Sequence, residues 1–153
     1  MMSRPSCEQL VQLVRSHLET VGEAITDVQA KGALVMIDSI LANVANRGGH
    51  EVAWMHEEIS ALVAEADNYI ANGQPGADTV AEALARVRNL DSTSLHVADV
   101  QRRYDAASEV LSRLLENCRG ADAANRSRVE HLLEQRLSRE FDIRGSFALA
   151  GRS

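Results

Sequence analysis

At 153 residues the chain is long enough to bury the core of one domain, and 45% of its residues are hydrophobic. Only 3% are aromatic, so Leu, Val, Ile, Ala and Met must fill the core, which suits closely packed helices better than a sheet. The net charge of −6 argues against a general nucleic-acid binder, because neutralising phosphates needs an excess of Lys and Arg.

The chain opens with the start signal of a helix. Ser6 can cap this helix, and Gln9 can return the hydrogen bond as a capping box. A stripe of apolar residues then follows at helical spacing up to about Gly22: Leu10, Leu13, Val14, Leu18 and Val21. We therefore predict an amphipathic first helix, with a short break over residues 22–27.

Residues 28–46 form the segment around which we expect the fold to be organised. Apolar residues cover well over half of the predicted helix circumference, and only Asp38, Ser39 and Asn43 interrupt them. A helix this apolar needs to be covered by several others, which predicts a place at the centre of the core. The pair Gly48-Gly49 is expected to end it, since glycine accepts the left-handed conformation that closes a helix.

Four further helices are predicted along the rest of the chain, over about residues 50–71, 79–89, 95–117 and 122–140. Short loops join neighbouring helices and place them side by side. The sequence therefore predicts an all-α fold, an antiparallel up-and-down bundle of five to six helices. We expect residues 1–141 to form this single domain and residues 142–153 to be a loosely ordered tail.

Cysteine content and hydropathy bear on the compartment. Cys7 and Cys118 are too few and too far apart for a disulfide scaffold or a zinc site. The first residues lack an apolar stretch of signal-peptide length, and we expect no run to approach the roughly 20 apolar residues that a membrane span needs. We expect a soluble cytoplasmic protein that does not engage a membrane.

No assembled catalytic constellation is present in the sequence. The Glu-x-x-His pattern of di-iron bundles, the Gly-x-Ser-x-Gly elbow and the glycine-rich phosphate loops are all absent. We therefore predict no catalytic residue and no cofactor. One alternative stays open: a small-molecule- or metal-binding bundle, possibly an enzyme, with a site lined by Trp54, His56, Glu57 and Tyr104.

Charge and the single tryptophan suggest where a partner would bind. Residues 1–101 carry 6 basic and 14 acidic side chains, whereas residues 102–153 carry 10 basic and 8 acidic ones. Most arginines of the second part can pair along their own helices, but Arg126 and Arg128, near a helix start, have fewer partners available. Trp54 lies off the main stripe of its helix, where a tryptophan can mark an interface. We predict that Trp54, Arg126 and Arg128 contact a protein partner. A nucleic acid is less favoured as the partner.

A family resemblance covers about the first 47 residues. It rests on these positions: Arg4-Pro5, Leu10, Val14 and Leu18, then a break and an Ala-rich helix through Leu34, Ile37 and Ile40. In this spacing the chain resembles an uncharacterised family of bacterial helical proteins that are encoded beside, or fused to, aminoglycoside-phosphotransferase-like kinases and acyl-CoA dehydrogenases. The resemblance implies an accessory protein that acts with a phosphotransferase-like or dehydrogenase-like enzyme, and it transfers no catalytic residue.

These observations favour a non-enzymatic helical accessory or interaction protein. We expect it to bind a partner enzyme, or to self-associate as a homodimer, through an exposed apolar patch.

Overall fold

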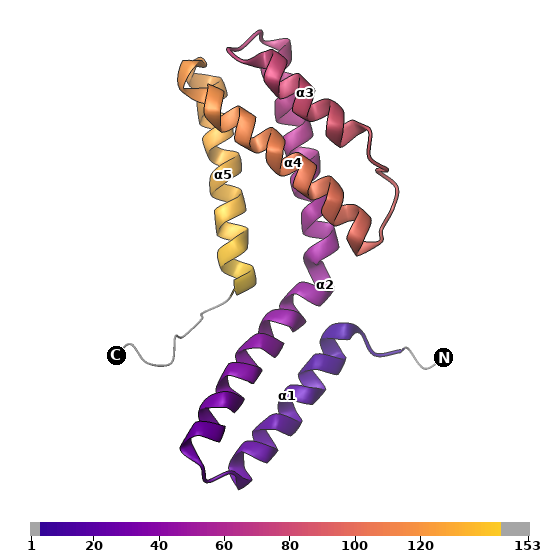
Figure 1. Cartoon of the computed structure of the whole chain (residues 1–153), viewed down its shortest axis with the longest axis vertical. Helices are drawn as coiled ribbons and strands as arrows, with labels where there is room; N and C mark the ends of the chain where they lie inside the picture. Colours follow the sequence, from indigo (N-terminus) through magenta and orange to yellow (C-terminus); the bar gives the residue numbers. More distant parts are fainter. Residues whose placement is uncertain (1–3, 145–153) are drawn as a thin grey trace. The chain divides into compact units, whose positions relative to one another are not determined.

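The computed structural model describes residues 4–144, and the side chains of residues 4–142. This part of the chain is 85% helical, with five α-helices and no strand. The helices are α1 (Cys7–Ala24), α2 (Val28–Ala71), α3 (Ala77–Arg88), α4 (Val97–Asn117) and α5 (Ala123–Arg144), with the 3-10 turn η1 (Cys118–Gly120) between the last two (Figure 1). The all-α helical fold predicted from composition and periodicity is confirmed, whereas the up-and-down order of the helices stays a prediction.

The chain divides into two compact units. We call the first, Met1–Glu51 with Glu140–Ser153, the hairpin unit, and the second, Val52–Arg139, the bundle unit. Helix α1 lies beside the first half of α2 in the hairpin unit, while the second half of α2 packs with α3, α4 and most of α5 in the bundle unit (Figure 1). The expected loose tail, residues 142–153, falls almost entirely outside the described residues.

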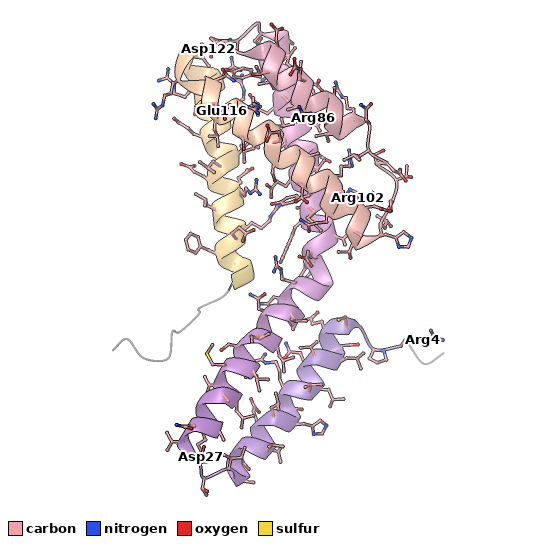
Figure 2. All side chains as sticks on the ribbon, in the orientation of Figure 1. Arg4, Asp27, Arg86, Arg102, Glu116 and Asp122 are labelled. Atoms are coloured by element: carbon pink, nitrogen blue, oxygen red, sulfur yellow. The ribbon has the colours of Figure 1, made fainter. Side chains whose placement is uncertain are left out.

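Side-chain caps fix where the first two helices begin. The Ser6 hydroxyl accepts a hydrogen bond from the backbone N–H of Gln9 at 3.1 Å, and the Gln9 side chain accepts one from the Ser6 N–H at 2.9 Å. This is the predicted capping box, which satisfies two N–H groups that a helix start leaves open. At the start of α2, Asp27 accepts from the Ala30 N–H at 2.7 Å; its place in the connecting loop is visible in Figure 2.

Helix α2 does not end at Gly48-Gly49 but continues to Ala71, with a total length of 44 residues, so the predicted break between a central and a third helix is wrong. Neither glycine has a positive φ; in the described residues only Gly73 and Gly76 do. The start of α1 packs closely here instead: a Cβ added to Gly48 would lie 3.4 Å from the Cys7 sulfur. Gly48 therefore lies at a contact between α1 and α2, inside a continuous helix rather than at a helix end.

The hydrophobic core lies in the bundle unit. Fully buried side chains from α2, α3 and α4, together with Val129 of α5, make up its centre: Ile59, Leu62, Tyr69, Val80, Leu84, Val87, Val110, Leu114 and Val129. Tyr69 belongs to this core although its ring carries a polar group. Its hydroxyl donates a hydrogen bond to the Pro75 carbonyl at 2.9 Å, and burial raises the pKa of the Tyr69 phenol.

The segment predicted to be the centre of the core, residues 28–46, is instead largely exposed. Ala45 is its one buried residue, and Val35, Met36 and Ile40 each leave about half of their surface exposed. The apolar periodicity predicted a helix correctly, but periodicity cannot tell how many neighbours that helix has. Within the described residues of its own unit, α1 is the helix packed along it.

Helix α2 also contains one stretch long and apolar enough to cross a membrane by length and composition, little of which is buried. The expectation that no run approaches that length is therefore wrong. A single such helix is weak evidence for a membrane span, since core helices of soluble proteins pass the same test.

Candidate interaction surface

Contacts along the hairpin establish that α1 and the first half of α2 run antiparallel. Arg15 donates two hydrogen bonds to the Asp38 carboxylate, at 2.7 and 3.0 Å. Towards the loop, Gly22 of α1 approaches Leu34, and at the other end Gly48 approaches Cys7. The hydrogen bonds from Arg15 hold the pKa of Asp38 below its usual range, so this pair stays charged and fixes the register of the two helices.

Each helix turns one stripe towards the other. On α1 the stripe is formed by the half-buried residues Val11, Arg15, Leu18 and Gly22, and on α2 by Leu34, Asp38, Leu41 and the buried Ala45. The spacing of three and four residues is that of a single helix face. This contact is narrow, and α1 has no buried residue at all.

A second apolar stripe runs beside the contact stripe on each helix. The described residues leave its side chains exposed. We call it the hairpin face, and its members are Leu10, Val14 and Val21 of α1 with Ile37, Ile40 and Val44 of α2. Their residue exposures range from 42% for Val44 to 53% for Ile40. His17, between Val14 and Val21, and Ala33, one turn before Ile37, occupy equivalent positions and are also exposed.

The two stripes lie on the same side of the hairpin. Each member directly precedes a residue of the contact stripe, as Val14 precedes Arg15 and Ile37 precedes Asp38. In a helix this offset is a rotation of about 100° in a fixed sense. Because α1 and α2 run antiparallel, equal rotations away from their contact bring both stripes to one side. The six side chains therefore form a continuous apolar surface.

The opposite side of the hairpin carries the charged residues. A groove of about 500 Å³ runs along it, lined by Glu19, Glu23, Lys31, Asp38 and Ser39 together with the apolar residues Leu18, Leu34 and Val35. Val35, which is 54% exposed, is the large apolar residue in that lining with the greatest exposure. The hairpin thus separates an uncharged apolar side from a charged one, as a surface helix pair does when its apolar side is covered.

Arg126 and Arg128, predicted to contact a partner, both have partners within the bundle unit. Arg128 lies 3.1 Å from both carboxylate oxygens of Glu65, whose residue exposure is 8%, and also donates to Asn125. Arg126 donates to the backbone carbonyls of Cys118 and Ala121 at 3.4 and 3.2 Å. Arg126 therefore closes the turn before α5 and Arg128 holds α5 against α2, although the sequence suggested fewer partners for these two arginines. Their contact with another protein stays a prediction.

Trp54 is half-buried within the bundle unit, so it does not stand out as a free aromatic anchor. Its backbone carbonyl accepts a hydrogen bond from Arg139 at 3.0 Å. The same arginine pairs with Glu57 at 3.1 Å. A role of Trp54 in binding a partner stays a prediction.

The residues of the predicted ligand site are only partly brought together. Tyr104 donates from its hydroxyl to Glu58 at 3.1 Å, and the Arg136 guanidinium lies over the Tyr104 ring, 5.1 Å from its centre. Glu57, one residue earlier, pairs with Arg139 instead. His56 has its Nε2 atom buried with no hydrogen-bond partner. Glu58 was not among the residues predicted to line this site, because nothing in the spacing marks which of the two adjacent glutamates faces α4.

This arrangement offers little to a metal ion. Among the described residues, no three His, Cys, Asp or Glu side chains are placed to hold one. Glu57, Glu58 and Glu65 each pair with an arginine of α5, so their carboxylates hold the two helices together. A cavity of about 220 Å³ lies between α2 and α5, bordered by two of these pairs.

Comparison with known proteins adds no further assignment, because no family model, curated protein or solved structure matches this chain.

Proposed function

We propose that this chain is a non-enzymatic helical interaction protein, which associates with another protein chain through the hairpin face. The observation that carries the proposal is the exposure of six large aliphatic side chains on one side of a two-helix hairpin. A contiguous exposed apolar surface on a folded protein is typical of an interaction site.

The weak internal packing of the hairpin unit supports the same proposal. Most helical stability in proteins comes from packing of an apolar face, and the 18 residues of α1 include none that is buried. The bundle unit, by contrast, has a core of its own. A chain that pairs a self-contained bundle with an uncovered amphipathic hairpin is suited to docking through that hairpin.

The sequence resemblance suggests the class of partner enzyme. It implies an accessory role beside a phosphotransferase-like or dehydrogenase-like enzyme, and its residues Leu10, Val14, Ile37 and Ile40 belong to the hairpin face. An interaction protein of this kind would stabilise or position the enzyme rather than perform chemistry itself.

Affinity capture from a lysate of the source cells tests the proposal, with the intact chain and two variants as baits. Ile40→Glu places a charge on the hairpin face, whereas Val35→Glu places the same charge on the opposite side of the same helix at almost equal exposure, 54% against 53%. We expect the intact chain and Val35→Glu to retain one enzyme in near-stoichiometric amount, or further copies of this chain, and Ile40→Glu to lose it. Equal retention by all three baits would contradict a role of the hairpin face.

A further inference from the structure

Resting on the proposed function, we propose that the occupant of the hairpin face is a second copy of the same hairpin, so that two chains form a four-helix bundle. The hairpin supplies two antiparallel helices, which is half of such a bundle. What the hairpin unit lacks is the other half of its core, since α1 buries no residue and the first half of α2 buries only Ala45.

The charge distribution of the hairpin permits like faces to meet. The stripe positions between Leu10 and Val21 and between Ala33 and Val44 hold no Asp, Glu, Lys or Arg. A two-fold axis brings each patch against its own copy, so a charged patch would repel itself, whereas an uncharged aliphatic one is self-complementary. The hairpin face therefore has no pattern of charged side chains that would favour a partner of complementary charge over a second copy of the same face.

The area of two hairpin faces reaches the lower limit for a specific protein interface. A half-exposed aliphatic side chain leaves roughly 80 Å² of apolar surface, so the six residues of the face supply roughly 500 Å² per copy and about 1,000 Å² for two copies. His17 and Ala33 lie within the same surface and add to this area. A specific interface between proteins needs at least about 1,000 Å² in total, so a pair of hairpin faces reaches that size.

A lipid surface suits this face less well. Helices that lie on a membrane carry many Lys and Arg on their polar side. Residues 4–51 instead hold four basic residues against six acidic ones. The charged Arg15–Asp38 pair sits halfway along the hairpin, where a membrane span would have to bury it.

Sedimentation velocity of the purified full-length chain, over a range from about 1 to 200 μM, tests the proposal. We expect a concentration-dependent dimer for the intact chain and for Val35→Glu. Ile40→Glu and Val14→Glu, on the two different helices of the face, are expected to raise the dissociation constant at least about a hundredfold, because two-fold symmetry places each new charge at the interface twice. Ile40→Ala, which adds no charge, is expected to raise it about tenfold.

Circular dichroism of the same samples shows whether a variant loses the dimer or loses its fold. A variant is used only if the denaturant midpoint of its bundle unit matches that of the intact chain. If the glutamate variants do not meet this criterion, the comparison rests on Ile40→Ala. If the intact chain stays monomeric at 200 μM, the dimer proposal is wrong. The proposed function is then still tested separately by the affinity capture. Monomers that co-sediment with phosphatidylcholine–phosphatidylserine vesicles would assign the face to a membrane. Dimers that persist in all variants would place the interface elsewhere and overturn the proposal.

Discussion

Individual buried polar groups in the bundle unit are matched to partners that the sequence pattern does not reveal. Glu65 has a side-chain exposure of 10%, and Arg128 supplies its positive charge from 63 residues further along the chain. Tyr69 likewise places its hydroxyl on the Pro75 carbonyl. Each such pair avoids the cost of a buried polar group without a partner, which is larger than the net gain of an ordinary hydrogen bond.

Loss of Arg128 should therefore reduce the stability of the bundle unit. We expect Arg128→Ala to lower the free energy of unfolding by about 1–3 kcal/mol, because Glu65 would be left charged and nearly buried. Urea denaturation followed by circular dichroism measures this loss. The matched control is Arg102→Ala, which breaks an ion pair with Asp99 at the surface and should cost less than about 1 kcal/mol. Equal costs for the two variants would contradict the structural role assigned to Arg128.

Asp122 gives the bundle unit a dependence on pH. Its carboxylate accepts hydrogen bonds from the backbone N–H and the side-chain amide of Asn125, at 2.8 and 2.7 Å, and from Gln74 at 2.7 Å (label in Figure 2). The backbone bond from Asn125 is the main cause that lowers the pKa of Asp122 from its ordinary value of 3.8.

Because the pKa of Asp122 is lower in the folded state, the unfolded chain binds more protons just below pH 4. The stabilisation from Asp122 is therefore fully present above its ordinary pKa, and it is lost as the pH falls through the pKa of the folded state. Asp122→Asn should therefore be less stable than the intact chain at pH 7, and this difference should shrink steadily below pH 4. Urea midpoints of both proteins from pH 7 to pH 2 provide the test. A difference that stays constant over this range would mean that the carboxylate charge contributes nothing.

At the scale of the elements, a substitution in the Gly48-Gly49 pair tests whether α2 is continuous there or ends there. In a helix interior, glycine is less favourable than alanine by about 0.5–1 kcal/mol. The position of a Cβ on Gly49 is open apart from one Glu8 oxygen at 3.6 Å. Gly49→Ala should therefore raise the thermal midpoint of the chain by a few degrees.

Gly76→Ala provides the contrast for this prediction. Gly76 has a φ of +73°, and a Cβ there would collide with the side chain of Asn117, so alanine should lower the midpoint clearly. If Gly49→Ala lowered the midpoint as Gly76→Ala does, α2 would be broken at Gly48-Gly49, as the sequence first suggested.

Local signals predicted those element boundaries well that residue types mark directly, either by a side-chain cap or by a loop rich in glycine, proline and asparagine. The Ser6–Gln9 capping box and the loop over residues 72–76 were both found from residue type and spacing. The continuity of α2 was missed because a Gly-Gly pair is compatible both with a helix end and with a helix interior. The sequence does not show which backbone conformation the pair adopts, and in the structure neither glycine has the positive φ of a helix end.

At the scale of the whole molecule, apolar residues are divided between a covered set and an uncovered one. The bundle unit buries its aliphatic residues in one core, whereas the hairpin unit leaves six of them on one side. Composition predicted the all-α class, since so few aromatic residues suit closely packed helices. It could not predict this division, because an apolar stripe has the same spacing whether the helix that covers it belongs to the same chain or to another.

The sequence predicts an exposed apolar patch as the interaction site, with Trp54, Arg126 and Arg128 as its markers, since tryptophan and arginine are frequent at interfaces. Their long-range partners Arg139 and Glu65 were not visible in the sequence. The stripe Leu10, Val14 and Val21 was recognised, but it was expected to pack inside the same molecule.

Amide hydrogen exchange, followed by mass spectrometry at increasing protein concentration, tests the central claim most directly. If another chain covers the hairpin face, peptides from α1 should exchange fast in dilute solution and slow down as the concentration rises, or as the captured partner is added. Peptides from α4, which lies in the core of the bundle unit, should exchange slowly throughout. Exchange of α1 that is as slow as that of α4 at every concentration, and unchanged by a partner, would contradict the account, because the hairpin would then be stable with its apolar face uncovered.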